Sequence, residues 1–213
     1  KVIEKGKAGP GLLAHVIIQK YCSHMPLYRQ SVMYGYEGID LSRSTMAHWV
    51  AQCSKILDPL VEEIKKSILS SPHIHADDTP VKVLAPGLGK TKIGRLWCYV
   101  LDGRPHGTDV PPEVCYFYSE DRKGIRPEEH LKDFQGVLHA DAYAGYNKLY
   151  VSESNPNALI KEAGCWAHMR RKFYEITIAS NNAKVAVEVI EQIRKIYKIE
   201  KDIRGSDPDH RLE

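Results

Sequence analysis

The chain has 213 residues, of which 43% are hydrophobic, and this is enough for one substantial core or two small lobes. Its formal net charge is only +3, so any binding to nucleic acid must come from local basic clusters and not from the total charge. Five scattered cysteines without a Cys-x-x-Cys pair argue against a disulfide framework and a four-cysteine zinc site, and they fit a reducing cytoplasm. We expect no membrane partner, because no apolar run is long enough to span a bilayer. The start at Lys1 without a methionine indicates a piece of a longer protein.

Residues 1–70 read as a helical N-terminal region. Apolar spacing predicts helices over residues 11–21 and 28–34. Ser42 is suited to cap a third helix, and Asp58-Pro59 predicts the start of a fourth that ends at Leu69. The turn before Ser42 resembles that of a helix-turn-helix, but an ordinary helical hairpin is the favoured interpretation because that pattern is permissive.

The hydrophobic period changes from helix to strand at Ser71. The predicted strands cover residues 73–79, 93–101, 114–119, 136–142 and 158–164. Glycine and proline mark a hairpin tip at 86–90 and a loop at 103–112. The remaining segments are predicted to be helical: a short helix over 126–134, an irregular helix over 144–154, and further helices over 167–180 and 183–204.

The order of these elements predicts the fold class. Three leading strands suggest a meander, and the later alternation of helix and strand suggests parallel additions. We therefore expect an α/β fold (of the α+β kind) whose sheet is mixed, with parallel and antiparallel strands. It would be similar to the ribonuclease-H-like sheet, in which the first and fourth strands are neighbours. The predicted domains are a helical lobe over 1–70, a catalytic core over 71–166 and a helical region over 167–213.

Two strand-like stretches each end on an acid. They are His75-Ala76-Asp77-Asp78-Thr79-Pro80 and His139-Ala140-Asp141-Ala142-Tyr143. A carboxylate on a buried strand costs free energy unless it is paired or binds a cation. If the two strands are neighbours, Asp77 and Asp141 meet at one sheet edge, and such a pair of carboxylates facing a polar pocket is typical of a magnesium site. The alternative is that both aspartates make turns with their own backbone.

Histidines accompany both acids. By the two-residue period of a strand, His73 and His75 share a face with Asp77, and His139 shares one with Asp141. Imidazoles beside carboxylates suit zinc or manganese better than magnesium, which supports an alternative function as a metallohydrolase of a small phosphoester or amide. A purely structural interpretation has each histidine packed and hydrogen-bonded beneath the acids.

Several longer strings occur in order along the chain. They are Lys20-Tyr21, Met25-Pro26-Leu27-Tyr28-Arg29-Gln30, Gly38-Ile39-Asp40-Leu41-Ser42-Arg43-Ser44-Thr45, Trp49, His75-Ala76-Asp77-Asp78-Thr79-Pro80-Val81, Asp141-Ala142-Tyr143-Ala144-Gly145-Tyr146, Gly164-Cys165-Trp166-Ala167-His168-Met169-Arg170-Arg171-Lys172-Phe173 and Ile196-Tyr197-Lys198-Ile199-Glu200. As an ordered set they closely resemble the DDE transposases of the bacterial insertion sequence 66 family, over essentially the whole chain. One departure is Asp78, which stands where the family usually has glutamate; this leaves Asp77 in the position of the first catalytic acid.

The resemblance implies DNA strand cleavage and strand transfer in a ribonuclease-H-like domain. It makes Asp77 and Asp141 catalytic ligands of two Mg²⁺ (or Mn²⁺) ions that serve an in-line phosphoryl transfer. The implied partners are DNA, as transposon ends and target, and further copies of the chain in the active complex. The implied location is the bacterial cytoplasm, in association with the nucleoid.

The family also needs a third acid, usually a glutamate on a helix after the fifth strand. The family's glutamate string is absent here, so we expect the third acid beyond residue 213, with Glu175 and Glu200 as weaker candidates. Glu200 stands four residues before Arg204, where a solvated ion pair is the simpler role. We therefore expect this fragment to bind divalent metal weakly and to be inactive in transposition by itself.

Basic residues open the helix that follows the fifth strand. Arg170, Arg171 and Lys172 are candidates for contacts with the DNA backbone, although a solvated charged face explains each one alone. A non-catalytic DNA-binding module is accordingly a second alternative function. The preceding Cys165-x-x-His168 resembles a signature that related transposases carry near the active site, and a buried cysteine with a helix-start histidine explains it equally well.

Overall fold

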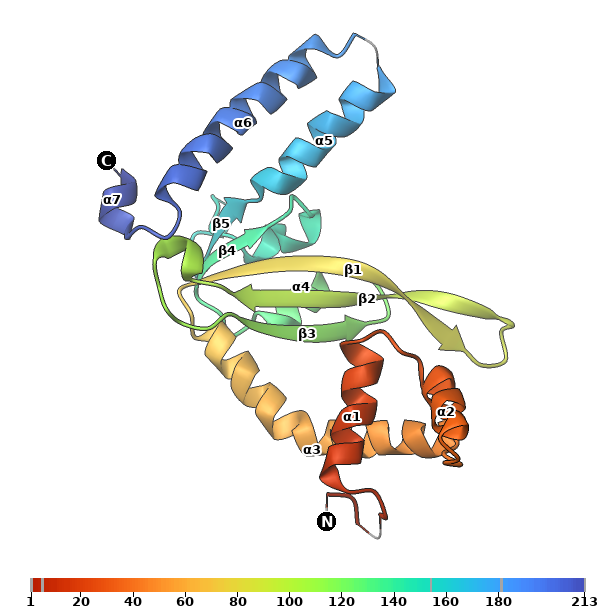
Figure 1. Cartoon of the computed structure of the whole chain (residues 1–213). Coiled ribbons are helices and arrows are strands. Elements are labelled where there is room, and N and C mark those ends of the chain that lie inside the picture. The colour runs from red at the N-terminus through yellow and green to blue at the C-terminus, as the bar shows by residue number, and fades with distance from the viewer. Residues whose placement is uncertain (1, 5, 154, 181, 213) are drawn as a thin grey trace. The chain divides into compact units, whose positions relative to one another are not determined.

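The computed structural model describes residues 2–4, 6–153, 155–180 and 182–212 (Figure 1). The chain divides into two compact units, Lys1–Glu63 and Ile64–Glu213, which we call the N-terminal unit and the sheet unit. Among the described residues no helix combines the length and the apolar character that crossing a membrane requires.

Three helices form the N-terminal unit. They are α1 (Pro10–Tyr21), α2 (Leu27–Tyr36) and α3 (Arg43–Leu69), whose last residues, 64–69, belong to the sheet unit. Ser42 caps α3 as predicted, because its Oγ accepts a hydrogen bond from the backbone N of Thr45 at 3.1 Å. Buried Gln30 on α2 donates to the carbonyl oxygens of Val16 at 3.2 Å and Met25 at 3.0 Å, which links α2 to α1.

The predicted helix start at Asp58-Pro59 is wrong, because α3 continues through Pro59. Proline inside a helix removes one hydrogen bond and crowds the preceding turn, at a cost of about 3 kcal/mol. Ending one helix and starting another would leave up to four unpaired carbonyls and four unpaired N–H groups. The continuous helix is the less costly arrangement here.

A five-stranded mixed sheet forms the centre of the sheet unit. Its strands are β1 (His73–Ala85), β2 (Lys90–Leu101), β3 (Glu113–Ser119), β4 (Gly136–Ala140) and β5 (Ile160–Gly164), and their order in the sheet is β3-β2-β1-β4-β5. The first three strands are antiparallel, while β4 and β5 add in parallel. The mixed α/β class and the pairing of the first strand with the fourth are confirmed.

The first three strands are longer than predicted, β3 by one residue only, and the last two are each two residues shorter, with β5 starting at Ile160. Val81 pairs with Gly94 and Ala85 pairs with Lys90, so β1 and β2 continue past the rest of the sheet as a two-stranded ribbon (Figure 1). In contrast, β4 ends at Ala140, and Asp141 is the first residue after it. The hairpin residues continue the ladder because each finds a main-chain partner across the strand pair.

The two faces of the sheet differ in character. Ile74, Trp97, Tyr99 and Leu138 are fully buried on the core face, beside Tyr146. Further segments of this unit are η1 (Arg104–His106), α4 (Ile125–His130) and η2 (Ala144–Leu149). Helix α4 and segment η2 are shorter than the helices predicted over 126–134 and 144–154. Alternation along β1 and β4 places their histidines on the opposite face from the core.

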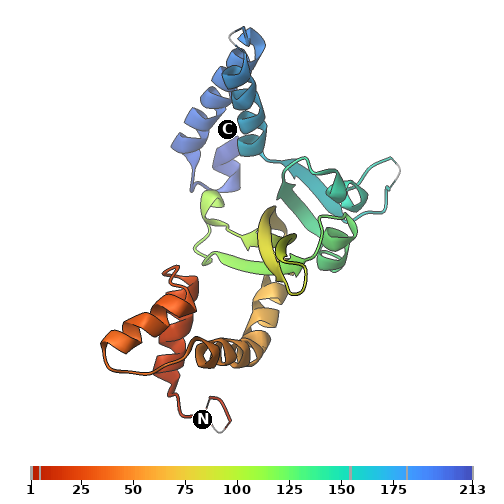
Figure 2. The same ribbon diagram turned by 90° about the vertical axis from the view of Figure 1, so that its right-hand side faces the viewer.

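The C-terminal part of the sheet unit is helical. It contains α5 (Trp166–Ala179), α6 (Lys184–Ile203) and the short α7 (Pro208–Leu212). Helices α5 and α6 lie side by side as a hairpin (Figure 2). Arg211 of α7, which the sequence analysis did not predict as helical, donates to Glu200 Oε2 at 2.6 Å and to the carbonyl of Pro105 at 3.2 Å, so it ties α7 to α6 and η1.

Candidate functional site

Asp77 and Asp141 lie at the same level of neighbouring strands. His75 pairs with His139 across β1 and β4, and each acid follows its histidine by two residues. The Asp77 side chain is 61% exposed and that of Asp141 is 25% exposed. The structure thus brings the two predicted site acids to one region at the end of the parallel pair.

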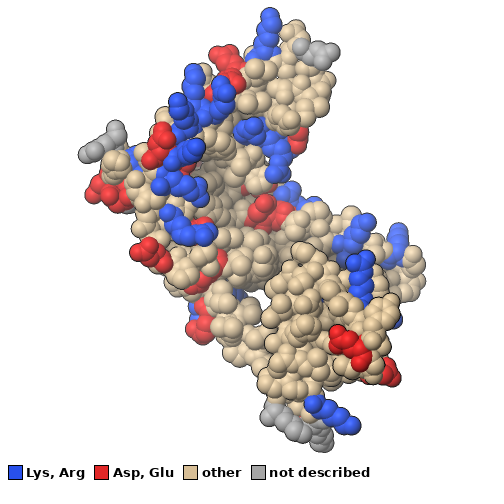
Figure 3. Space-filling view, in the orientation of Figure 1, with Lys and Arg blue, Asp and Glu red and all other residues tan. Residues whose placement is uncertain are grey.

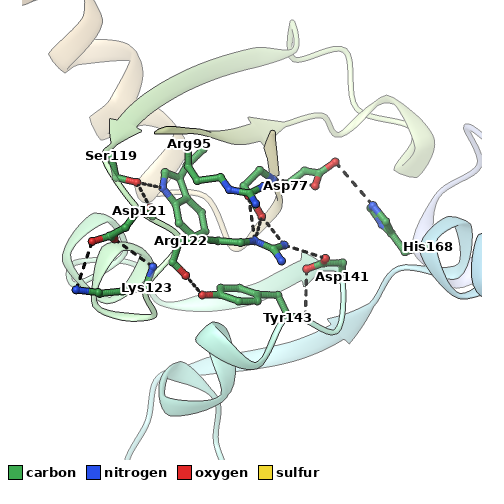
Figure 4. A network of polar contacts seen from close by, with 11 residues as sticks. Asp77, Arg95, Ser119, Asp121, Arg122, Lys123, Asp141, Tyr143 and His168 are labelled. Carbon is green, nitrogen blue, oxygen red and sulfur yellow. Dashed lines mark hydrogen bonds and ion pairs between the residues drawn. The ribbon is translucent and has the colours of Figure 1, made fainter. Parts of the chain in front are cut away.

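Each acid uses one carboxylate oxygen for its own backbone. Oδ1 of Asp77 accepts from the N of Asp78 at 2.8 Å, and Oδ1 of Asp141 accepts from the N of Tyr143 at 3.2 Å. The turn contact of the alternative interpretation is therefore present at Asp141, whose partner lies two residues on, whereas Asp77 lies inside β1 and contacts only the next residue. The second oxygens face other side chains: Oδ2 of Asp77 lies 3.8 Å from Nε2 of His168, and Oδ2 of Asp141 lies 3.5 Å from Nη2 of Arg122 (Figure 4).

The start of α5 carries His168 to the acids. The backbone N of Cys165, the residue before α5, donates to the carbonyl of Ala140 at 2.9 Å, which fixes the helix start next to the end of β4. One helical turn later, His168 points its Nε2 at Asp77, while its Nδ1 is buried without a hydrogen-bond partner among the described residues. The Cys165-x-x-His168 string therefore belongs to the site, with Cys165 as an anchor and His168 as a contact.

The buried acid of the first motif is Asp78 and not Asp77. The Asp78 side chain is 1% exposed, and two arginines neutralise it: Nη1 of Arg95 lies 2.9 Å from Oδ2, and Nη2 of Arg122 lies 2.6 Å from Oδ1. The argument that a buried carboxylate needs a partner is correct, but the partner at this position is a pair of guanidinium groups. Neither arginine was predicted to pair with this acid; the sequence made Arg95 a candidate for contact with DNA.

Arg122 connects Asp78 to the second motif. Its guanidinium also lies over the Tyr143 ring, 4.1 Å from the centroid, and the Tyr143 hydroxyl donates to the Arg122 carbonyl. Asp78 and Tyr143 both contact the Arg122 guanidinium, and together they restrict its movement. Its positive charge is therefore held beside Asp141.

A pocket of about 770 Å³ opens beside Asp141. Residues from four segments line it, among them Arg122, Glu162, Trp166, His168 and Lys172. Glu162 lies on β5 opposite Leu138 and is an acid that the sequence analysis missed, because an exposed glutamate in a short strand has no distinguishing local pattern.

The two weaker candidates for a third acid have other partners. Glu175 lies 3.8 Å from Nζ of Lys172, and Glu200 binds Arg211 at 2.6 Å. Glu200 forms an ion pair, the role expected for it, but its partner is Arg211 of α7 and not the expected Arg204.

Comparison with known proteins identifies the family. Residues 5–213 match the sequence model of the transposase IS66 family. The chain belongs to the IS66 family of transposases. It is 36% identical over 214 residues to the uncharacterized protein y4qI of Sinorhizobium fredii (strain NBRC 101917 / NGR234), covering 100% of this chain and 40% of y4qI. To y4hP of the same strain it is 35% identical over 219 residues, covering 98% of this chain and 39% of y4hP. The chain thus spans about two fifths of the length of these relatives.

A cluster of three histidines accompanies the acids in this IS66-family chain. Ring nitrogens of His73, His75 and His139 all lie within 4.8 Å of one another. Burial lowers the pKa of each imidazole, and together with the neighbouring histidines it lowers that of His75 to about 4. The structural interpretation expected each ring to be hydrogen-bonded, and at His139 the buried Nε2 has no partner among the described residues.

Basic side chains gather on the helical hairpin next to the site. Figure 3 shows Lys and Arg along α5 and α6. Arg170 lies over the Tyr174 ring at 5.9 Å from the centroid, Arg171 is exposed, and the Lys172 side chain is 79% exposed. Since Lys172 also lines the pocket, this IS66-family chain has positive charge on the same helix that carries His168.

Proposed function

We propose that this chain is the catalytic region of an IS66-family DNA transposase, in which Asp77 and Asp141 bind divalent metal ions for DNA strand cleavage and strand transfer. The observation that carries the proposal is the position of the two acids at one level of β1 and β4, each with one oxygen directed away from its own backbone. The strand order β3-β2-β1-β4-β5 supports a ribonuclease-H-like core.

The residues present fit Mg²⁺ or Mn²⁺. Asp77 and Asp141 offer hard carboxylate oxygens, both are partly open to solvent, and the pocket leaves room for water and phosphate oxygens as further ligands. When bound, a pair of such ions supplies the charge that activates a nucleophilic oxygen and stabilises the leaving oxygen of an in-line displacement.

The remaining residues position the acids and the substrate. His168 faces Asp77, and Arg122, held by Asp78, faces Asp141, so each acid has a neighbour that limits its rotation. Lys172, together with Arg170 and Arg171 on the same helix, is placed to contact phosphates of DNA beside the pocket.

The proposal includes the organisation of the chain and of its complex. We assign residues 1–70 to a helical lobe, 71–166 to the catalytic core and 167–213 to the start of a helical insertion. The active complex contains DNA and more than one copy of the protein, and it works in the bacterial nucleoid. Resemblance of the ordered motifs to this family supports these assignments.

Calorimetry with Mn²⁺ tests the metal site directly. We expect the folded chain to bind Mn²⁺, the double variant Asp77→Asn/Asp141→Asn to lose that binding, and Asp109→Asn, in an exposed loop, to keep it. Unchanged binding by the folded double variant would refute the proposal. Glu162→Gln adds a further comparison: weakened binding would make Glu162 a third acid of the site, and unchanged binding would place the third acid elsewhere.

A further inference from the structure

A second cluster of metal-ligating groups lies on the face of the sheet that carries the two acids. His73 and His75 stand two residues apart on β1, and His139 is the register partner of His75 on β4. Main-chain pairing therefore sets the three imidazoles side by side, with ring centroids 4.7 Å apart for His73 and His75 and 4.7 Å apart for His75 and His139.

The arrangement has the ligand chemistry of a transition-metal site. Three imidazole nitrogens are a common donor set for Zn²⁺, with a fourth position left for water or another group. Tetrahedral Zn–N bonds of about 2.1 Å place two ligand nitrogens about 3.4 Å apart. The nitrogens here already lie within 4.8 Å of one another, and small rotations of the rings would close the difference.

An independent observation points to a missing ligand. Nε2 of His139 is buried and has no hydrogen-bond partner among the described residues. A buried polar nitrogen without a partner costs free energy, and native structures usually satisfy such a group with protein, water or an ion. Coordination of a cation by His139 would satisfy it.

We propose that His73, His75 and His139 form a Zn²⁺-binding site that is separate from the site of Asp77 and Asp141. Imidazole ligands favour zinc over magnesium, whereas the two carboxylates favour magnesium or manganese, so the two sites differ in the ion that they select. An ion held by both β1 and β4 would cross-link these strands two residues before each acid. It would thereby support the position of the acids without touching the substrate.

The neighbourhood of the cluster offers a fourth ligand. His106 lies on η1, and the centroid of its ring is 5.6 Å from the centroid of the His73 ring. A shift of this short segment would bring a fourth imidazole to the ion, and water would complete the coordination otherwise.

Calorimetry with Zn²⁺ on the whole chain tests the proposal. We expect one ion per chain, and we expect His75→Gln and His139→Gln each to weaken binding by at least about 100-fold, since even outer-shell partners of a metal contribute 10–100-fold. The exposed His48→Gln and the double variant Asp77→Asn/Asp141→Asn should bind Zn²⁺ as the parent does. Failure of the parent to bind, equal binding by folded His139→Gln, or loss of binding in the acid double variant would overturn the proposal.

A second measurement uses the unmodified chain and so does not depend on the folding of variants. In NMR spectra of the imidazole groups, Zn²⁺ should shift the resonances of His73, His75 and His139 first among the ten histidines. First shifts at His168 and its neighbours would instead place zinc at the acid site. The Zn²⁺ experiments and the calorimetric test of Mn²⁺ at Asp77 and Asp141 are independent. Failure of zinc binding at the histidines would leave the proposed Mn²⁺ site at the two acids untouched.

Discussion

Arg122 donates to Oδ1 of Asp78 through two nitrogens, Nη2 at 2.6 Å and Nε at 2.8 Å, and its Nε also donates to Oδ2 at 3.1 Å. Asp78 is buried, and the same guanidinium reaches Oδ2 of Asp141 at 3.5 Å. The charge of Asp78 is thus used inside the protein to hold Arg122, and Arg122 in turn stands beside an acid of the candidate metal site. Stability and the geometry of the site depend on the same contact.

Asp78→Ala should lower the free energy of unfolding of the sheet unit by about 3 kcal/mol. Breaking a buried ion pair typically costs 3–5 kcal/mol, and we expect the low end because the Arg95 and Arg122 side chains are 26% and 36% exposed. Urea unfolding followed by fluorescence suits the measurement, because buried Trp97 reports on the same unit. Glu191→Ala, which removes an exposed pair with Arg194, is the matched control and should cost much less. Equal losses in the two variants would contradict this assignment.

Gly136→Ala should destabilise the protein by at least about 2 kcal/mol. Gly136 begins β4 with φ of 143°, and an added Cβ would lie 2.3 Å from the carbonyl oxygen of Pro72. That oxygen already accepts a hydrogen bond from Val137 at 2.9 Å, so it cannot move away freely. Thermal unfolding checks the loss. Gly164→Ala on β5, where nothing lies within 4 Å of the new methyl group, should change stability little.

Stability should fall as the pH drops from about 6.5 towards 4. Burial lowers the pKa of His130 from 6.5 to about 4, in a contact with the Tyr99 hydroxyl at 3.0 Å and the stacked Phe117 ring. Between these pH values the unfolded chain binds a proton that the folded chain does not, so unfolding becomes more favourable. The lowered pKa values of the three clustered histidines act in the same direction.

The melting temperature measured across this pH window checks the effect of His130. His130→Gln should show a shallower decline than the parent, and exposed His48→Gln should decline like the parent. A parent protein with a flat profile would show that His130 takes up its proton without unfolding.

Local pattern and chain order predicted much of the sheet but little of its ionic network. The two-residue period correctly placed His75 and Asp77 on one strand face, and the order of elements correctly paired the first strand with the fourth. The contact between Asp78 and Arg122 joins residues 44 positions apart, so it depends on the turn after β3, which no local pattern specifies. Asp78, whose side chain is 1% exposed, was therefore interpreted only as a departure from a family motif.

The basic cluster should contribute to DNA affinity through phosphate contacts. We expect the triple variant Arg170→Ala/Arg171→Ala/Lys172→Ala to bind duplex DNA more weakly and to show a smaller salt dependence. Each lost phosphate contact should reduce the slope of log K against log salt concentration by about 0.9 for a duplex. Fluorescence anisotropy at several salt concentrations measures both quantities.

A charge-matched control separates local contact from total charge. Lys195→Ala/Lys198→Ala/Lys201→Ala removes the same formal charge from α6, while Lys172 still lines the pocket beside Asp141. If DNA runs past the acids, the α5 variant should lose more affinity and more of the salt dependence than the α6 variant. Equal losses would mean that the hairpin attracts DNA only through its overall charge, and the path of DNA beside Asp141 would then have no support from α5.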